Sequence, residues 1–168
     1  MAGTLTRRAL FDRFRGGPVS LRPPWVIGEA SFSERCDGCG DCIGACPSGL
    51  LIAGRGRLPV VEFAKSHCTF CGACADACRK NCFVPDRVAV RPWSLVARVS
   101  AACIEPKGVA CRLCEAACDA TAIRFRPQIG GGSSISISEA CTGCGACLAT
   151  CPVGALAIVD TQSEEIAA

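Results

Sequence analysis

One spacing of cysteines, C-x2-C-x2-C-x3-C, occurs three times in this chain of 168 residues. The three runs begin at Cys36, Cys68 and Cys141, and the gaps between their four cysteines are identical. Cysteine makes up 17 residues, whereas the chain has two Trp, seven Phe and no Tyr, so it has little hydrocarbon from which to build a large core. The chain must therefore be held in shape by disulfides or by metal.

The compartment expected from the sequence favours metal over disulfides. Arg7 and Arg8 resemble the paired arginines of an export signal. The apolar segment that should follow them is interrupted at Asp12, Arg13 and Arg15. No uncharged apolar stretch approaches the roughly 18 residues of a membrane span. We therefore expect a cytoplasmic protein without a membrane span, whose cysteines stay reduced and bind metal.

The spacing also selects the kind of metal centre. Structural zinc sites usually take cysteines as separated C-x2–4-C pairs. The repeated run is instead the one with which bacterial ferredoxins hold [4Fe–4S] clusters. Glycine follows the second cysteine of each run, at Gly40, Gly72 and Gly145, where the loop must turn tightly beside the cluster. Pro47 and Pro152 follow the fourth cysteine of two runs, and we expect each to start a short helix.

A fourth run, Cys103, Cys111, Cys114 and Cys118, repeats the pattern with a stretched first gap. Seven residues separate Cys103 from Cys111, and Arg112 stands where the other runs have glycine. The run is either a fourth site or the remnant of one. In two-cluster ferredoxins the fourth cysteine of each run binds the other cluster. This rule favours a fourth site, because the cysteines of the runs that remain after three clusters have taken their ligands make one complete set of four.

Crosswise ligation divides sixteen cysteines into four sets. We expect these sets to be Cys36, Cys39, Cys42 and Cys78; Cys46, Cys68, Cys71 and Cys74; Cys118, Cys141, Cys144 and Cys147; and, from the stretched run, Cys103, Cys111, Cys114 and Cys151. Four [4Fe–4S] clusters are favoured, and three are the minimum. We interpret the seventeenth cysteine, Cys82, as a packed or free thiol, with substitution as a ligand as the alternative. His67, the only histidine, is expected to be a surface neighbour of the second run.

The flanks of the runs have the alternation and length of short strands. Residues 50–52 and 59–63 surround a Gly-rich turn, and residues 134–139 and 155–159 flank the last run. The predicted fold class is therefore α+β, with two tandem two-cluster bacterial ferredoxin-like domains. The expected boundaries are 1–30 for a basic N-terminal arm, 31–84 for the first domain, 85–102 for a linker and 103–168 for the second domain.

Positive charge is concentrated near the N-terminus. Residues 1–28 contain five arginines and one aspartate, whereas the whole chain has a net charge of +3. The arm is either a solvated segment or a docking segment for an acidic partner. Nucleic acid is not expected as a partner, because no basic helix or aromatic-interleaved patch follows. We also do not expect an enzyme, because the sequence has no nucleotide fingerprint, and four thiolates leave a cluster no open coordination position.

Segments outside the regular runs add a resemblance to a known family. The chain resembles the NapF family, the ferredoxin-type accessory proteins of periplasmic nitrate reductase systems, in Arg7-Arg8, Arg22-Pro-Pro-Trp25, Pro92-Trp93, the stretched run with its ending at 122–126, and the final run CTGCGACLATCPV. Two residues depart from the family pattern. Arg79 stands where the family often has proline, and Cys82 is an additional cysteine.

The resemblance implies a cytoplasmic iron–sulfur accessory protein. Its implied partner is the molybdenum-containing catalytic subunit of nitrate reductase, which it would contact before export. There it would assist maturation, by supplying electrons or by helping cluster assembly. The residues by themselves leave two other functions open, a general soluble polyferredoxin electron carrier and the ferredoxin subunit of a larger oxidoreductase.

Overall fold

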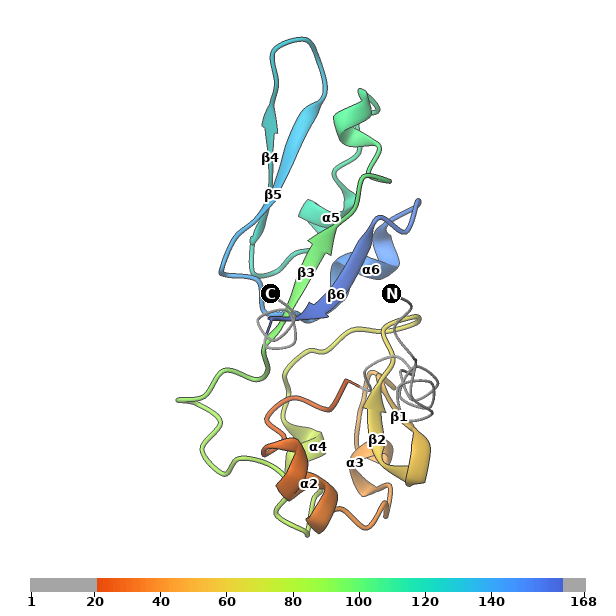
Figure 1. Cartoon of the computed structure of the whole chain (residues 1–168), viewed down its shortest axis with the longest axis vertical. Coiled ribbons are helices and arrows are strands. Elements are labelled where there is room, and N and C mark those ends of the chain that lie inside the picture. The colour runs from red at the N-terminus through yellow and green to blue at the C-terminus, as the bar shows by residue number, and fades with distance from the viewer. Residues whose placement is uncertain (1–20, 162–168) are drawn as a thin grey trace, which may run out of the picture.

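The computed structural model describes residues 21–161, which form two halves stacked along the long axis of the molecule (Figure 1). Each half combines short helices with an antiparallel hairpin, so the predicted α+β fold is confirmed. The expected strands around 50–63, 134–139 and 155–159 are present within one or two residues of their predicted bounds. No helix among residues 21–161 has the length and apolarity to cross a bilayer.

The first half is built around one hairpin and two helices that carry cysteines. Its elements are α2 (Glu29–Arg35), α3 (Asp41–Gly44), β1 (Leu51–Ala53), the 3-10 helix η1 (Arg55–Arg57), β2 (Pro59–Val61) and α4 (Ala73–Asp76). Strands β1 and β2 pair antiparallel, with Ile52 opposite Val60. A single antiparallel bridge between Val26 and Phe83 joins the two ends of this half.

The second half repeats this plan with longer strands. Its elements are β3 (Leu95–Val99), the 3-10 helix η2 (Glu105–Lys107), α5 (Leu113–Ala116), β4 (Ile123–Pro127), β5 (Ser133–Ile137), α6 (Ala146–Thr150) and β6 (Leu156–Asp160). The hairpin is β4–β5, and β3 pairs antiparallel with β6. The β3–β6 pair therefore occupies the place that the Val26–Phe83 bridge has in the first half.

The expected boundaries of the arm and the linker differ from the structure. Trp25 lies inside the range predicted as the arm, yet it is buried, and its indole N–H donates to the carbonyl oxygen of Val90 at 3.2 Å. Strand β3 lies inside the range predicted as the linker. Both segments contain apolar residues that pair with the opposite end of their half, which local composition does not reveal. The rest of the arm, residues 1–20, lies outside the described residues.

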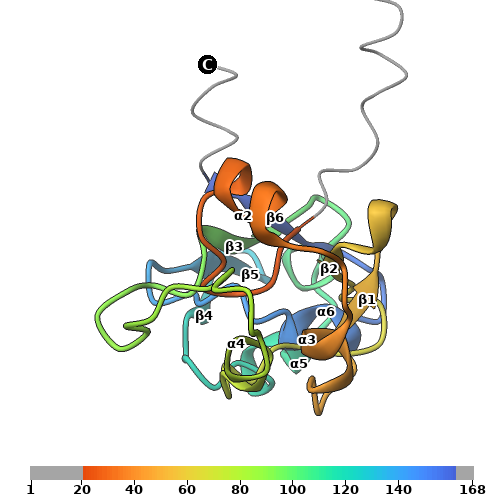
Figure 2. The ribbon, with the colours of Figure 1, turned by 90° about the horizontal axis from the view of Figure 1, so that it is seen from below.

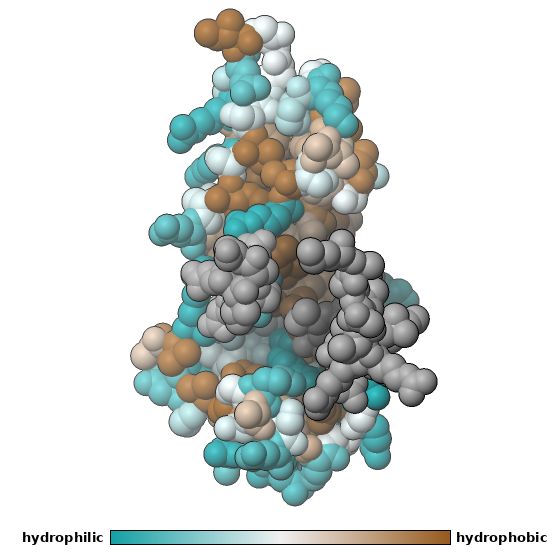
Figure 3. Space-filling model, viewed as in Figure 1, coloured by the Kyte–Doolittle hydropathy of each residue, from teal (hydrophilic) through white to brown (hydrophobic). Residues whose placement is uncertain are grey.

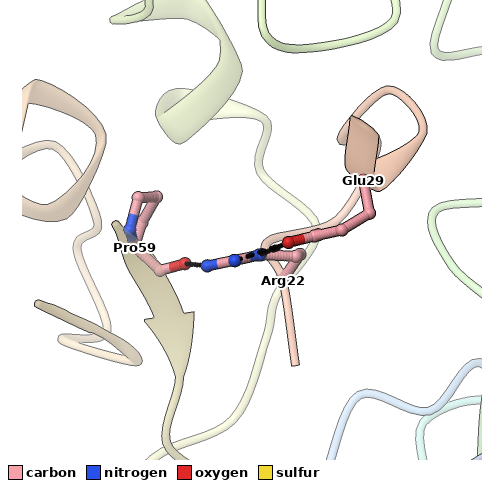
Figure 4. Close-up of polar contacts among 3 residues, drawn as sticks. All are labelled: Arg22, Glu29 and Pro59. Carbon is pink, nitrogen blue, oxygen red and sulfur yellow. Dashed lines mark hydrogen bonds and ion pairs between the residues drawn. The ribbon is translucent and has the colours of Figure 1, made fainter. Parts of the chain in front are cut away.

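Arg22 is a structural residue rather than a free charge of the arm. Figure 4 shows its guanidinium between Glu29 and the carbonyl oxygen of Pro59. Its Nη2 lies 2.6 Å from Glu29 Oε1, and its Nη1 donates to Pro59 at 3.2 Å. The guanidinium also lies over the ring of Phe32, a side chain with no exposed surface. Arg22 thus fastens α2 to strand β2.

The prediction that prolines start helices after the fourth cysteines is wrong. Pro47 and Pro152 lie in turns, which are closed by hydrogen bonds from Gly49 N–H to the Cys46 carbonyl and from Gly154 N–H to the Cys151 carbonyl. The short helices lie before the fourth cysteine and carry the third one. The fixed φ of proline suits a turn as well as a helix start, so the sequence did not separate the two.

The buried residues form three clusters, one in each half and one between them. Leu50, Phe63 and Leu95 make the middle cluster, with Trp93 and Leu148 packed against it. Buried cysteines are members of the two outer clusters. On the surface, polar and apolar residues are interspersed over the face seen in Figure 3.

Candidate metal centres

Four separate cavities are each surrounded by four of the sixteen cysteines of the runs, and Cys82 adds a fifth thiol to one of them. One cavity is lined by Cys36, Cys39, Cys42 and Cys78, the second by Cys46, Cys68, Cys71 and Cys74, the third by Cys118, Cys141, Cys144 and Cys147, and the fourth by Cys103, Cys111, Cys114 and Cys151. We refer to them in this order as sites A, B, C and D. Each site takes three cysteines from one run and one from the other run of the same half. The groups match the four sets expected from crosswise ligation.

Site D, which belongs to the stretched run, is as large as the regular sites. The cavity volume is about 20 Å³ at each of the four sites. The walls of site D are apolar, with Val99, Phe125 and Leu156 among them. The stretched gap has therefore neither closed the cavity nor displaced a cysteine from it.

Each regular run uses a left-handed glycine to turn from the loop into its helix. Gly40, Gly72 and Gly145 have φ values of 86°, 79° and 85° and precede α3, α4 and α6. A residue with a Cβ is disfavoured there. The helix that follows places the third cysteine of the run in the protein interior, at Cys42, Cys74 and Cys147. These glycines do what the sequence predicted.

The stretched run makes the same turn with a different backbone. Arg112, at the position of the glycine, has φ −127° and ψ 22° and still precedes a short helix, α5, whose Cys114 is buried. Its guanidinium lies over the Phe125 ring and beside the Glu115 carboxylate. A negative φ removes the need for glycine, so Arg112 does not argue against a site.

The seven-residue gap between Cys103 and Cys111 is closed by a residue that the sequence did not single out. Glu105 begins the 3-10 helix η2 inside the insert and is 5% exposed. Its carboxylate accepts a hydrogen bond from the backbone N–H of Cys111. The hydrogen bonds from Cys111 and from the Ser133 hydroxyl hold the pKa of Glu105 below its usual value. Glu105 thus joins the two ends of the stretched gap, and a lone acidic residue between two cysteines gives no sequence signal for this role.

Backbone N–H groups point at several of the cysteine sulfurs. The N–H of Phe70 donates to Cys68 Sγ at 3.4 Å, and that of Ala155 donates to Cys151 Sγ at 3.2 Å. At Cys46, burial acts to raise the pKa, but hydrogen bonds from Ser48 and from backbone N–H groups lower it overall. Such bonds stabilise thiolates and, in iron–sulfur proteins, adjust the reduction potential.

Unless a positive charge lies between them, the buried cysteines of the cavities favour the neutral thiol form over the thiolate. Burial, with the neighbouring thiols acting in the same direction, raises the pKa of Cys42, Cys68 and Cys74 to about 11 and that of Cys147 to about 12. A bound metal core supplies the compensating positive charge and takes thiolates as ligands. The chemistry of the donor set therefore fits a metal guest with four thiolate ligands.

The geometry fits a cluster better than a single ion. Zn–S bonds of about 2.3 Å bring all four sulfurs of a zinc site around one point. Among residues 21–161, no three His, Cys, Asp or Glu side chains converge in this way, and the cysteines surround a cavity instead. Their donor set and spacing are those of [4Fe–4S] ligation.

The two remaining candidate residues differ in their relation to the cavities. Cys82 is 1% exposed and lies at the wall of site A, where its thiol is close to those of Cys36 and Cys78. His67 is exposed and lines none of the four cavities. The structure thus places a fifth thiol at site A only.

Comparison with known proteins gives the same division of the chain. Residues 29–83 and 107–155 each match a family described as a 4Fe-4S dicluster domain. The chain is 40% identical over 151 residues to the ferredoxin-type protein NapF of Escherichia coli K12. This alignment covers 89% of this chain and 91% of that protein. It is 40% identical over 149 residues to the NapF of Haemophilus influenzae Rd, covering 88% and 83% of the two chains.

A second group of relatives has another name. The methylamine utilization ferredoxin-type protein MauM of Paracoccus denitrificans is 30% identical over 156 residues, covering 83% of this chain and 70% of that protein. All these relatives are described as ferredoxin-type proteins, and the two dicluster matches support 4Fe-4S clusters as the cofactors of the two halves.

Proposed function

Because this chain belongs to the NapF family of ferredoxin-type proteins, we propose that it is a cytoplasmic accessory protein of a periplasmic nitrate reductase. In this role it binds the catalytic subunit of that enzyme and assists its maturation before export. The relatives support an iron–sulfur electron-carrier role in general. The partner and the maturation step are the specific content of the proposal.

The observation that carries the proposal is the set of four cavities, each lined by four cysteines of the runs, with Cys82 as a fifth at site A. We propose that sites A to D hold four [4Fe–4S] clusters, with the cysteines of each cavity as ligands. When bound, such clusters supply one-electron oxidation and reduction. The cysteines fill all the ligand positions and the apolar walls limit access of water, so the sites suit the storage and delivery of electrons rather than the conversion of a substrate.

Charge suggests how the partner is recognised. Four thiolate-bound clusters are expected to make the folded part of the protein anionic, whereas Arg7, Arg8, Arg13 and Arg15 precede it in the sequence. These arginines lie outside the described residues. We propose that they dock an acidic surface of the reductase subunit, since opposite charges speed encounter and orient partners.

Replacing the four arginines with alanine tests docking. The variant is expected to co-purify less reductase subunit at low salt while it retains its iron. A control that replaces Arg79, Arg124 and Arg126, which are exposed and lie outside the arm, should bind normally. If the arm variant binds as well as wild type, docking by the arm is wrong.

A deletion strain separates maturation from routine electron supply. If the protein serves maturation, the exported reductase from this strain should lack activity even with an artificial electron donor. Full activity with that donor would instead support the carrier function, because the enzyme would then be complete and lack only its electrons.

A further inference from the structure

Sites B and C belong to different halves but are joined by a direct backbone contact. The N–H of Cys68 donates to the carbonyl oxygen of Cys144 at 2.9 Å. Cys68 lines site B, and Cys144 lines site C. The two cysteine loops therefore touch across the boundary between the halves.

Aromatic side chains hold the two loops together. The indole N–H of Trp93 donates to the carbonyl oxygen of Thr142, within the loop of site C, at 2.7 Å. The Trp93 ring also makes edge contacts with Phe70, from the loop of site B, and with Phe63, at centroid distances of 5.5 and 6.1 Å. Arg91 adds a 2.6 Å hydrogen bond to the Cys141 carbonyl. One tryptophan thus contacts both loops.

Gly145 shows how closely the halves approach. A Cβ at this position would overlap the ring of Phe63, which belongs to the first half. Gly40 is its counterpart in the first run, with φ 86° against 85° at Gly145, but it has no atom within 4 Å of the Cβ position. The left-handed turn requires glycine at both positions, and only Gly145 is also required by a contact between the halves.

The other neighbouring sites adjoin through buried helices. Helix α3, which carries Cys42 of site A, contacts α4, which carries Cys74 of site B. In the second half, α5, which carries Cys114 of site D, contacts α6, which carries Cys147 of site C. Helices α3 to α6, which carry these four cysteines, gather on one side of the molecule in the end-on view of Figure 2. The sites therefore follow one another in the order A, B, C, D.

We propose that the four sites form one electron path, which crosses from the first half to the second at Cys68 and Cys144. When one electron passes from site B to site C, site B is oxidised by one electron and site C is reduced by one electron, and no other reactant is needed. The path makes the chain a single four-electron unit rather than two independent two-electron carriers. This inference rests on the proposed ligation of sites A to D.

Magnetic coupling in the fully reduced full-length protein tests the path. We expect wild type to show spin–spin broadening between sites of different halves in its electron paramagnetic resonance spectrum. Gly145→Ala should lose that part of the broadening, because its methyl group forces Phe63 and the two loops apart. Gly40→Ala introduces the same backbone strain away from the boundary, and its spectrum should keep the coupling between the halves.

A kinetic arm uses a variant whose fold is less affected. Trp93→Phe removes the hydrogen bond to Thr142 but keeps an aromatic ring. After injection of one electron, redistribution between the halves should be slower in Trp93→Phe than in wild type, at equal iron content. Unchanged coupling in Gly145→Ala together with unchanged redistribution in Trp93→Phe would overturn the path. An iron content below that of four clusters in wild type would instead overturn the ligation on which the path rests.

Discussion

The carboxylate of Glu105 accepts a hydrogen bond from the backbone N–H of Cys111, across the longest gap within any of the cysteine runs. Gly132, at the tip of the β4–β5 hairpin, lies close to this loop, since a Cβ at Gly132 would be 3.1 Å from the carbonyl oxygens of Glu105 and Pro106. The insert is therefore folded back on itself and packed against the hairpin. A gap of seven residues in place of the usual two is thereby compatible with a site of ordinary size.

Removal of the Glu105 carboxylate should loosen site D alone. We expect Glu105→Ala to release about four irons, the content of one [4Fe–4S] cluster, faster than the rest when an iron chelator is added under anaerobic conditions. Glu105→Gln keeps an acceptor oxygen and should largely restore the slow release. Glu62, whose exposed carboxylate accepts from the N–H of Ala64, provides the control Glu62→Ala. Uniform release in the Glu105→Ala variant would contradict a local role.

Iron content should distinguish a fourth site from a remnant. Wild type is expected to hold about 16 irons per chain, four for each [4Fe–4S] cluster. Cys103→Ser and Cys151→Ser should each lower the content to about 12, although the two residues lie in different runs. Cys82→Ser serves as the control and should keep about 16, because site A has four other cysteines. A wild-type value of about 12 that Cys103→Ser leaves unchanged would make the stretched run a remnant.

Trp25 should stabilise the first half as a core residue. Trp25→Ala removes a buried ring that packs edge-on to Phe70, and large-to-small changes of this kind cost about 3–5 kcal/mol. Anaerobic denaturant titration, followed by the visible absorbance of the clusters, would measure the loss. Val88, which is fully exposed, supplies the control Val88→Ala, for which no change is expected. Equal unfolding midpoints for the two variants would show that Trp25 does not stabilise the first half and belongs to a loosely attached arm.

The ion pair of Arg22 and Glu29 should contribute modestly. Glu29 remains mostly exposed, so a double-mutant cycle with alanine at both positions should give a coupling of about 0.5–1 kcal/mol. Hydrogen bonding to Arg22 lowers the pKa of Glu29 below its usual value of 4.5. The contribution is therefore complete at pH 7 and is lost only when acid protonates Glu29. A coupling near zero at pH 7 and low salt would show that the pair adds nothing.

The sequence was most informative where the chemistry imposes fixed distances. A cluster requires ligands at set spacings, so the runs predicted the four groups of cysteines that now surround sites A to D. The hairpin around residues 50–63 was predicted because it is local in the chain, whereas β4 (Ile123–Pro127), the partner of the predicted strand β5, was missed. The resemblance to NapF is confirmed by relatives that cover most of this chain.

The sequence was least informative where residues far apart meet. Trp25 and strand β3 were assigned to an arm and a linker, because their partners, Val90 and β6, lie about 60 residues away in the sequence. The contact of Cys68 with Cys144 depends on how the two halves dock, which no spacing within a run encodes. Glu105 acts through its fold in the insert rather than through a motif.

The grouping of cysteines also has a consequence for the order in which the protein is made. As the chain leaves the ribosome, site B gains its last cysteine at residue 74 and site A at residue 78; sites C and D follow at residues 147 and 151. Cys36 of site A and Cys103 of site D are the cysteines translated first in their halves. The fourth cysteine of each of these sites is translated only after the other site of the same half is complete. Biosynthesis thus presents binding sites in pairs, one pair per domain. The assembly machinery meets the first pair before the second has been translated.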